Sequence, residues 1–356
     1  MKNIRVLVVG CGNMGASHAQ AYQSLDGFEI CGIVSRGRSK EQLNEQLGGG
    51  FALFDKYEDA LAATSPDAVC ISTYPETHES YAIQALEKGC HVFIEKPLAD
   101  TVAGAERVVA AARKAGKKLV TGYILRHHPS WQYFIGAAQK MGKPLVMRMN
   151  LNQQSHGRMW TVHRNLMQSL SPIVDCGVHY IDVMCQMTRS KPLQVSAIGA
   201  RLTEDIPAGN YNYGQLQIRF EDGSVGWYEA GWGPMISETA FFVKDVIGPK
   251  GSVSIVAKSA SAAGHSSDIG SHTKTESIRI HHADIDAQDE FSKKDEWVDL
   301  EDEPDHQELC NREQAYFLKA IVADIDLTDH MNDAVNSLRI AFACDESVRT
   351  GQVVLL

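Results

Sequence analysis

The chain has 356 residues, which is too many for one ordinary hydrophobic core and predicts two domains. With 44% hydrophobic and 22% charged residues it has the composition of a globular protein, and the lack of a long apolar run argues against a membrane-embedded chain. The formal net charge of −10, without a basic cluster, argues against nucleic acid as a partner.

Eight cysteines are scattered along the chain without a Cys-x-x-Cys pair, and most lie in apolar segments. This pattern predicts reduced core residues rather than disulfides or metal ligands. Residues 2–10 have the pattern of a buried strand and lack the features of a cleaved signal. We therefore expect a cytoplasmic protein.

From residue 4 to about residue 122, short apolar runs alternate with amphipathic stretches. The runs have the length of strands, and the stretches 76–88 and 101–115 have helical spacing. This alternation predicts parallel strands joined by crossover helices, and hence a twisted sheet covered on both faces. The strands are expected at 4–9, 27–34, 52–54, 68–72, 91–95 and 118–123.

After residue 123 the alternation gives way to helices followed by strands. Helices are predicted over 129–141 and 172–187, and strand-like runs separated by turn signals follow between residues 193 and 258. This order favours a mostly antiparallel sheet with helices on one face.

The C-terminal part of the chain contains a predicted loop and two predicted helices. Residues 258–276 are rich in Ser, Ala, Gly and His without periodicity, so we expect a mobile surface loop. The helices are predicted at about 305–323 and 331–349. The expected domains are residues 1–122 and 123–356.

The stretch VVGCGNMGASH at residues 8–18 spells Gly-x-Gly-x-x-Gly between the first strand and a predicted helix. In a dinucleotide site the first glycine lets the strand turn, the second lets the backbone approach a pyrophosphate, and the third lets the helix pack on the strand. The alternative is a tight turn without a ligand. The candidate cofactor residues are Gly10, Gly12, Asn13, Met14 and Gly15.

The end of the second strand distinguishes between the two common dinucleotides. An Asp or Glu there would accept hydrogen bonds from an unmodified ribose, whereas the stretch from Val34 to Lys40 contains no acid. Hydroxyl and basic side chains, here Ser35, Arg36 and Arg38, suit a 2′-phosphate. NADP is therefore favoured over NAD, and the alternative is that the arginines belong to a solvated loop.

Ligands bind beyond the carboxyl ends of parallel strands, so the residues after the fourth and fifth strands are candidates. The fifth strand is followed by Glu95-Lys96-Pro97. Because the residue before a proline disfavours the helical conformation, we expect Lys96 to stay extended where a substrate would lie. The alternative is a surface turn. After the fourth strand the candidates are Thr73, Tyr74, Pro75 and His78.

The segment from Ser171 to Asp182 has the pattern of a helix start, with Ser171 as N-cap and a proline in the first turn. Asp175, His179 and Asp182 follow at i, i+4 and i+7, beside an apolar stripe. Histidine exchanges a proton near neutral pH, and an acid one turn away can fix its tautomer. The alternative is a solvated polar face. No metal site is expected, because no Cys or second His completes a tetrahedron.

Together these motifs resemble the glucose-fructose oxidoreductase/inositol dehydrogenase/rhizopine-catabolism (Gfo/Idh/MocA) oxidoreductases. The resemblance covers nearly the whole chain, because the order and spacing of the motifs match those of the family as well. It implies an α/β protein with an N-terminal Rossmann dinucleotide-binding domain and a C-terminal α/β domain with a large open, mostly antiparallel sheet. The motifs are the glycine turn, Tyr-Pro-x-x-His at 74–78, Glu-Lys-Pro at 95–97 and Asp-x-Gly-x-His-x-x-Asp at 175–182.

The resemblance also implies roles for matching residues. Lys96 would donate a hydrogen bond to the reacting oxygen, Asp175 would orient and bind the substrate, and His179 would act as acid and base. Glu95 and Lys96 would lie at the cofactor, and family substrates are mostly sugars, cyclitols and their derivatives. Further substrate-binding candidates are Tyr123, Arg126, Trp160 and His163. The alternative for Arg126 is an ion pair, and the alternative for Trp160 is packing in the core.

We expect a reversible hydride transfer between NADP and a carbinol carbon of a sugar-like substrate. One alternative is a glycoside-cleaving enzyme with tightly bound NAD(P), and another is a dinucleotide-binding regulator, against which Lys96 and His179 argue. We also expect a homo-oligomer, a dimer or tetramer, packed through the exposed sheet of the second domain.

Overall fold

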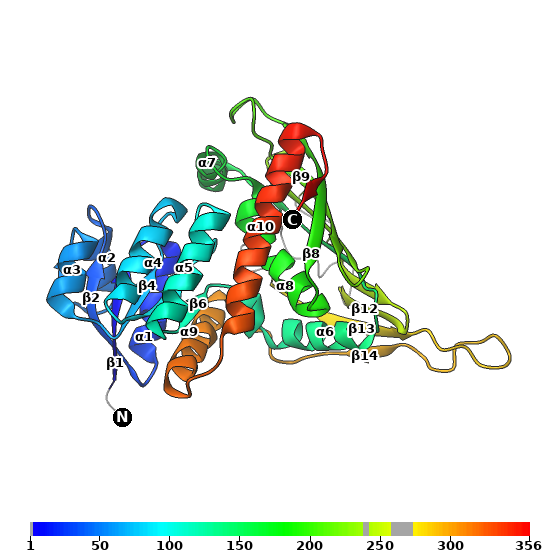
Figure 1. Ribbon diagram of the computed structural model, residues 1–356, viewed down its shortest axis with the longest axis horizontal. Helices are drawn as coiled ribbons and strands as arrows, with labels where there is room; N and C mark the ends of the chain where they lie inside the picture. Colours follow the sequence, from blue (N-terminus) through cyan, green and yellow to red (C-terminus); the bar gives the residue numbers. More distant parts are fainter. Residues whose placement is uncertain (1–2, 238–241, 258–272) are drawn as a thin grey trace. The chain divides into compact units, whose positions relative to one another are not determined.

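The computed structural model describes residues 3–237, 242–257 and 273–356. Its internal contacts divide the chain into two compact units (Figure 1). Unit 1 comprises Met1–Ile124 together with Pro304–Val335, and unit 2 comprises Leu125–Glu303 together with Asn336–Leu356. The expected boundary at residue 122 lies two residues before the end of the first segment of unit 1, and the expected division lacks the C-terminal segment that returns to unit 1.

Unit 1 contains a six-stranded sheet in the order β3-β2-β1-β4-β5-β6, in which all neighbouring strands are parallel. Its central strands are buried on both faces, as the apolar runs predicted. The Rossmann architecture expected from the sequence is thus confirmed. The strands are β1 (Ile4–Val9), β2 (Phe28–Val34), β3 (Leu53–Phe54), β4 (Ala68–Ile71), β5 (His91–Ile94) and β6 (Leu119–Thr121).

Capping residues mark the start and the end of α5 (Val102–Ala115) in unit 1. The hydroxyl of Thr101 accepts a hydrogen bond from the Gly104 amide at 3.0 Å and so caps the start of α5. Gly116, at φ +62°, ends the same helix in the left-handed conformation. The elements are α1 (Asn13–Ser24), α2 (Ser39–Gln46), α3 (Tyr57–Thr64), η1 (Pro75–Thr77), α4 (His78–Glu87), α5 (Val102–Ala115) and η2 (Ile124–His127), of which η2 runs into unit 2.

Helix α9 (His306–Val322) brings the C-terminal segment back to unit 1, where it packs against α1. The Asp305 carboxylate caps it by accepting from the Glu308 amide at 2.8 Å. Phe317 places its ring 6.3 Å from that of Phe28 and 6.1 Å from that of Phe93, between centroids. The segment is therefore part of the hydrophobic core of unit 1. Helix α10 (Thr328–Thr350) follows, and the division between the units falls within it.

Unit 2 contains a nine-stranded sheet in the order β14-β13-β12-β11-β7-β10-β9-β8-β15. Neighbouring strands are antiparallel except for the parallel pair β7 and β10, so the sheet is mixed but mostly antiparallel, as expected. The strands are β7 (Val146–Gln154), β8 (Pro192–Ala200), β9 (Tyr213–Phe220), β10 (Val225–Gly233), β11 (Lys244–Gly248), β12 (Gly251–Val256), β13 (Ser277–His282), β14 (Glu296–Val298) and β15 (Val354–Leu355).

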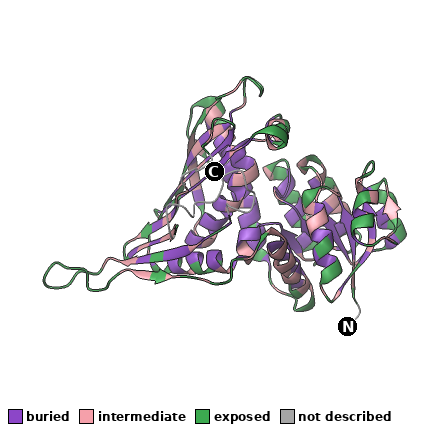
Figure 2. Cartoon of the chain, turned by 180° about the vertical axis from the view of Figure 1, so that it is seen from behind, coloured by how far each residue is buried: buried purple, intermediate pink, exposed green. Residues whose placement is uncertain are grey.

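Helices of unit 2 pack on one face of this sheet, and buried residues gather on that face (Figure 2). Tyr228 of β10 points to the helices and stacks on Tyr180 with ring centroids 5.0 Å apart. On the opposite face Glu229 accepts hydrogen bonds from Asn152 at 2.6 Å and Tyr213 at 3.0 Å. The helices are α6 (Pro129–Lys140), α7 (Gly157–Leu166), the π-helix η3 (Ile173–Gly177) and α8 (Val178–Thr188).

The predicted loop at 258–276 lies largely outside the described residues, since the structure describes only its last four positions. Of these, Thr273 and Thr275 are buried. The indole N–H of Trp131 donates to the Thr273 carbonyl at 2.9 Å, and the Thr275 amide donates to Glu303 at 3.2 Å. This end of the segment is therefore anchored to α6 and to the chain before α9.

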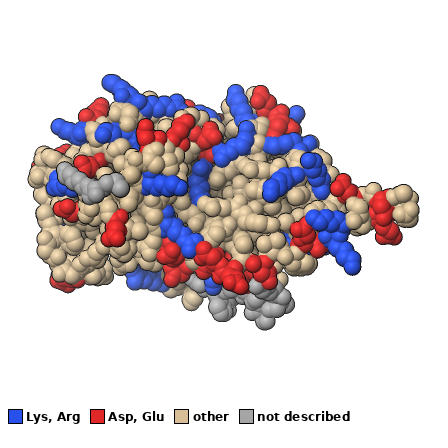
Figure 3. All heavy atoms as spheres, turned by 90° about the horizontal axis from the view of Figure 1, so that it is seen from below, with Lys and Arg blue, Asp and Glu red and all other residues tan. Residues whose placement is uncertain are grey.

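On the face shown in Figure 3, Lys and Arg side chains are interspersed with Asp and Glu side chains. Among the described residues, no helix is both long and apolar enough to cross a membrane. All eight cysteines are free.

A buried ion pair links η2 to α8 within unit 2. The Arg126 guanidinium donates to both carboxylate oxygens of Asp182, from Nε at 2.8 Å, and Gln186 donates to the same carboxylate at 2.9 Å. The Asp182 side chain is only 1% exposed. The spacing of the sequence places Asp182 with Asp175 and His179 on one polar face, but the Asp182 side chain is buried in the protein.

Asp182→Ala should lower the free energy of unfolding by about 3–5 kcal/mol, because it leaves the Arg126 charge buried without its partner. Glu79→Ala is the matched control, since it removes the carboxylate of the exposed Arg107–Glu79 pair. It should change stability far less. Chemical denaturation of both variants measures the difference, and equal losses would show that the Arg126 charge does not depend on Asp182.

Candidate active site

The glycine turn between β1 and α1 is built from two glycines that packing requires and one that faces open space. A Cβ on Gly10, which has φ +97°, would lie 2.4 Å from the Ser72 carbonyl oxygen. A Cβ on Gly15 would lie 1.9 Å from the Gly10 carbonyl oxygen. A Cβ on Gly12 would meet no heavy atom within 4 Å. Gly12 is therefore not needed for packing within the chain.

The start of α1 lies at this open position. Its N-cap is Gly12, which has no side chain to satisfy the first helical amides, and Asn13 is exposed. Unsatisfied amides and the positive end of the helix favour an anion. Residues 10–15, Met14 included, therefore fit a dinucleotide pyrophosphate that approaches the backbone at Gly12.

The segment after β2 combines hydroxyl groups with exposed cations. Ser35 and Ser39 are joined by a hydrogen bond of 2.7 Å between their hydroxyl groups. Lys40 is neutralised by Asp55 at 2.7 Å. Within the described part of the chain, the exposed side chains of Arg36 and Arg38 have no hydrogen-bond or ion-pair partner, so both remain available to a ligand.

The segment after β4 is tied to the segment after β5 by His78. One ring nitrogen of His78 lies 2.7 Å from the Pro97 carbonyl oxygen and the other lies 3.0 Å from that of Thr73. Burial lowers the pKa of this imidazole. His78 therefore has partners inside unit 1, whereas Tyr74 is exposed and Thr73 and Pro75 are half-buried. The direct cofactor contact predicted for His78 remains a prediction.

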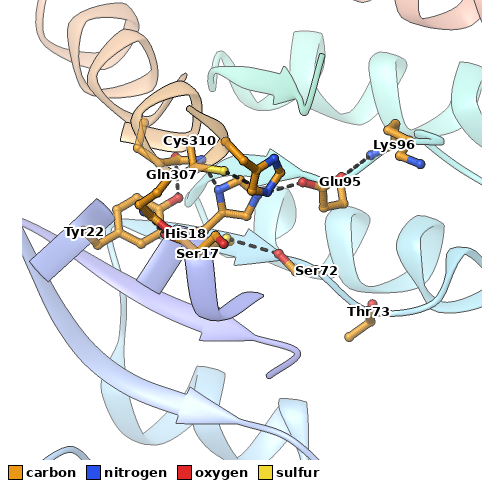
Figure 4. Close-up of polar contacts among 12 residues, drawn as sticks. Ser17, His18, Tyr22, Ser72, Thr73, Glu95, Lys96, Gln307 and Cys310 are labelled. Atoms are coloured by element: carbon orange, nitrogen blue, oxygen red, sulfur yellow. Dashed lines mark hydrogen bonds and ion pairs between the residues drawn. The ribbon is translucent and has the colours of Figure 1, made fainter. Parts of the chain in front are cut away.

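The segment after β5 begins with a buried carboxylate. Glu95 lies between His18 and Lys96 (Figure 4), at 2.7 Å from His18 Nε2 and 3.2 Å from the Lys96 amide, which donates to it. Lys96 is half-buried, and its peptide bond to Pro97 is cis. The carboxylate of Glu95 thus has partners within the protein, and the cofactor contact expected of it remains a prediction.

The start of α8 in unit 2 has the predicted cap and an unexpected π-helical turn. Ser171 Oγ accepts from the Val174 amide at 3.1 Å, as an N-cap does. The next residues wind as the π-helix η3, a rare form that is frequent at functional sites. A Cβ on Gly177 would lie 2.8 Å from Tyr228 Cε1, so glycine lets this turn approach the sheet. Asp175 and His179 are both half-buried.

Residues of β7, α7 and β10 surround the beginning of this turn. The Cys176 sulfur lies 3.5 Å from an Asp175 carboxylate oxygen and 3.7 Å from the Gln153 amide oxygen, so its thiol can donate to one or the other. The Trp232 indole N–H donates to the same Gln153 oxygen at 2.9 Å. The His163 ring stacks on Trp232 with centroids 4.2 Å apart and an angle of 9° between the rings.

Burial lowers the pKa of His163 to about 4, although the charge of Asp175 opposes this shift. Its imidazole is therefore neutral near pH 7. The structure thus brings His163 near Asp175, as expected of two substrate-site residues, and adds Gln153 and Trp232. Sequence reasoning missed these two because they come from strands far apart in the chain. The alternation of apolar and polar residues in β7 was a local signal for Gln153 alone.

Three other predicted substrate residues already have contacts within their own units. Tyr123 is 1% exposed and lies near His330, with ring centroids 6.4 Å apart. Arg126 pairs with Asp182 inside unit 2. The Trp160 indole N–H donates to Asp205 at 3.3 Å. Substrate contact by each remains a prediction.

The chain is similar to a solved structure over its whole length and to curated proteins over part of it. In 18% of aligned positions the chain is identical to the myo-inositol 2-dehydrogenase of Lactobacillus plantarum, with a TM-score of 0.78 and full coverage of both chains. The 4-carboxy-2-hydroxymuconate-6-semialdehyde dehydrogenase of Sphingobium is 32% identical over 45% of this chain and 54% of its own. The inositol 2-dehydrogenase of Agrobacterium fabrum is 30% identical over 51% and 53%. The chain thus spans about half the length of these curated relatives.

Two family profiles match the chain. One, described as the oxidoreductase family with an NAD-binding Rossmann fold, covers residues 4–123, and the other, described as the GFO/IDH/MocA C-terminal domain, covers residues 135–254. Each match falls mainly within one of the two units. With the glycine turn and the parallel sheet, they establish that the chain belongs to the Gfo/Idh/MocA family of oxidoreductases.

Proposed function

We propose that this protein is an NADP-dependent dehydrogenase that oxidises a carbinol, or reduces the carbonyl, of a sugar, cyclitol or related polyol. The observation that carries the proposal is the open space at Gly12 above the uncapped start of α1. The glycine turn follows β1, and Lys96 follows β5 of the same sheet. An anion site and a cationic donor at the carboxyl ends of one parallel sheet are typical of a dinucleotide-dependent enzyme.

The proposed chemistry assigns one task to each of three side chains. When bound, the nicotinamide accepts or gives the hydride. His179 takes the hydroxyl proton during oxidation and returns it during reduction. Lys96 donates a hydrogen bond that stabilises negative charge on the reacting oxygen, and Asp175 orients the substrate and the imidazole.

The neighbours of Asp175 support a polyhydroxylated substrate. Gln153 offers an amide, His163 a neutral imidazole, and Trp232 an aromatic ring that holds both in place. Such groups exchange hydrogen bonds with hydroxyls without demanding charge on the ligand. The names of the relatives, which include inositol and a carboxylated semialdehyde, agree with a polar substrate bearing an oxidisable carbon.

We also propose a homo-oligomer that packs through the face of the unit 2 sheet opposite its helices. Strand register places five exposed apolar side chains on this face, on the same side as Glu229. Ile198 is 65% exposed and Trp297 is 61% exposed, and the others are Val146, Val225 and Ile247. Apolar side chains collected on one face favour association.

Lys96→Ala and His179→Ala should each lower kcat by roughly 10²–10³-fold, because each removes a group that acts on the reacting oxygen or its proton. Dissociation constants for NADP should stay within about threefold of the wild-type value. Lys88→Ala, an exposed lysine at the opposite ends of the strands, is the control. Wild-type turnover by either variant at the site would contradict the assignment. Cofactor that co-purifies, with no net NADPH formed, would favour glycoside cleavage.

Gly12→Ala should lower thermal stability only slightly, because alanine is a somewhat poorer N-cap than glycine and its methyl group enters only open space. It should weaken dinucleotide binding about tenfold or more. Gly15→Ala should instead destabilise the protein, because its Cβ would collide with the Gly10 carbonyl oxygen. Calorimetric titration and thermal unfolding separate the two effects. Unchanged affinity in Gly12→Ala would place the dinucleotide elsewhere.

NADP should bind more tightly than NAD in separate calorimetric titrations. Replacing Arg36 and Arg38 together by Ala should weaken NADP binding about tenfold or more, because charge-assisted hydrogen bonds to the 2′-phosphate are lost. NAD binding should hardly change. Tighter binding of NAD by the wild-type protein would instead identify these arginines as solvated surface residues.

Sedimentation at micromolar concentration should detect a dimer or tetramer. Ile247→Lys, which places a charge on the proposed interface, should shift the distribution to smaller species. Val322→Lys on α9 is the control, because Val322 is also exposed but lies in unit 1. A monomeric wild-type protein would exclude the proposed interface at that concentration.

A further inference from the structure

A buried polar cluster lies where α9 crosses the start of α1 and the end of β5, all within unit 1. Its central members, His18, Glu95 and Glu313, are each at most 6% exposed. One nitrogen or oxygen atom from each lies within 4.8 Å of one from the other two. Two carboxyl groups and an imidazole thus lie together in a nearly fully buried space next to Lys96.

A chain of hydrogen bonds runs through this cluster from Tyr22 to Glu95. The Tyr22 hydroxyl donates to Gln314 Oε1 at 2.6 Å, and the Gln314 amide in turn donates to His18 Nδ1 at 3.0 Å. Because Nδ1 accepts, the imidazole proton lies on Nε2, which donates to Glu95 Oε1 at 2.7 Å. The other Glu95 oxygen accepts the Lys96 amide (Figure 4). The chain of donors therefore ends on an ionised Glu95.

The surroundings of Glu313 disfavour a negative charge on its carboxyl group. Its side chain is 0% exposed, and burial together with the Glu95 charge raises its pKa well above the usual range. Burial raises the pKa of Glu95, but the contact with His18, the charge of Lys96 and the hydrogen bond from the Lys96 amide together lower it. Two carboxyl groups this close in a buried space are stable with one proton between them.

Other titratable groups that pack on the cluster stay neutral near pH 7. Burial raises the pKa of Tyr22 and Cys310, and raises that of Cys70 on β4 to about 12. Burial lowers the pKa of His306 on α9. Among the described groups around it, the charge of the cluster therefore depends on the two glutamates.

We propose that Glu313 is a positioning residue which remains a neutral acid beside ionised Glu95, and that this arrangement fixes the backbone of Lys96. Ionisation of Glu313 would set two carboxylates against each other and weaken the contacts that Glu95 makes with His18 and with the Lys96 amide. The cluster also joins Lys96 to α1, the helix that starts at the glycine turn. The effect on turnover rests on the proposed function, whereas the protonation state of Glu313 does not.

Infrared spectroscopy tests the protonation state without any substrate. Wild-type protein at neutral pH should show the carbonyl stretch of a buried protonated carboxyl group, shifted in deuterated water. Glu313→Gln should remove this band. Glu308→Gln, whose side chain on the same helix is 46% exposed, should keep it. A wild-type spectrum without the band, or a band that persists in Glu313→Gln, would overturn the proposal. A cation bound by the three side chains would also abolish the band, since it requires both carboxylates.

Turnover tests the positioning role. Glu313 should set an alkaline limit on kcat, and Glu313→Gln, whose amide cannot ionise, should lose that limit. Glu95→Gln should lower kcat about tenfold at all pH values with little change in the dissociation constant for NADP. Identical pH profiles in wild type and Glu313→Gln would overturn the positioning role. Absence of turnover with any polyol would refute the proposed function, and the infrared result would still stand.

Discussion

Everything at the cofactor end of unit 1 depends on one close approach of backbone to backbone. Strand β1, the start of α1 and the segment after β4 meet at Gly10 and Gly15, where a single methyl group would overlap a carbonyl oxygen. This contact fixes the direction of α1 and therefore where its free amides point. It also sets His18 one turn further along α1, against Glu95. The anion site and the Lys96 segment are thus positioned by the same constraint.

The two units divide the proposed work in a way that their chemistry explains. Unit 1 supplies the amides at the start of α1 and side chains that follow its strand ends, such as Arg36, Arg38 and Lys96. Unit 2 supplies side chains on a π-helical turn and on neighbouring strands, such as Asp175, His163 and Gln153. A fixed cofactor frame combined with an exchangeable wall of side chains agrees with a family whose members act on different polar substrates.

The sequence predicted the unit 1 sheet, the glycine turn and most helices because those signals are local. Residues that depend on distant partners escaped it. Asp182 had the spacing of a polar face, yet a π turn and Arg126 bury it. Glu313 on an amphipathic helix has the pattern of a solvated residue, and only the crossing of α9 over α1 buries it. The alternation in Val146–Gln154 was a local signal that was overlooked, and with it Gln153.

The return of residues 304–335 to unit 1 has a consequence for biosynthesis. Phe317 and Gln314 belong to the core and polar network of the first unit, but the ribosome makes them after nearly all of unit 2. Unit 1 therefore cannot complete its core while its first segment is being synthesised. The apolar surface around Phe28 and Phe93 stays uncovered until Phe317 has been made. Domains usually fold in the order of their synthesis, whereas here the first unit to emerge is completed only when the second is almost entirely made.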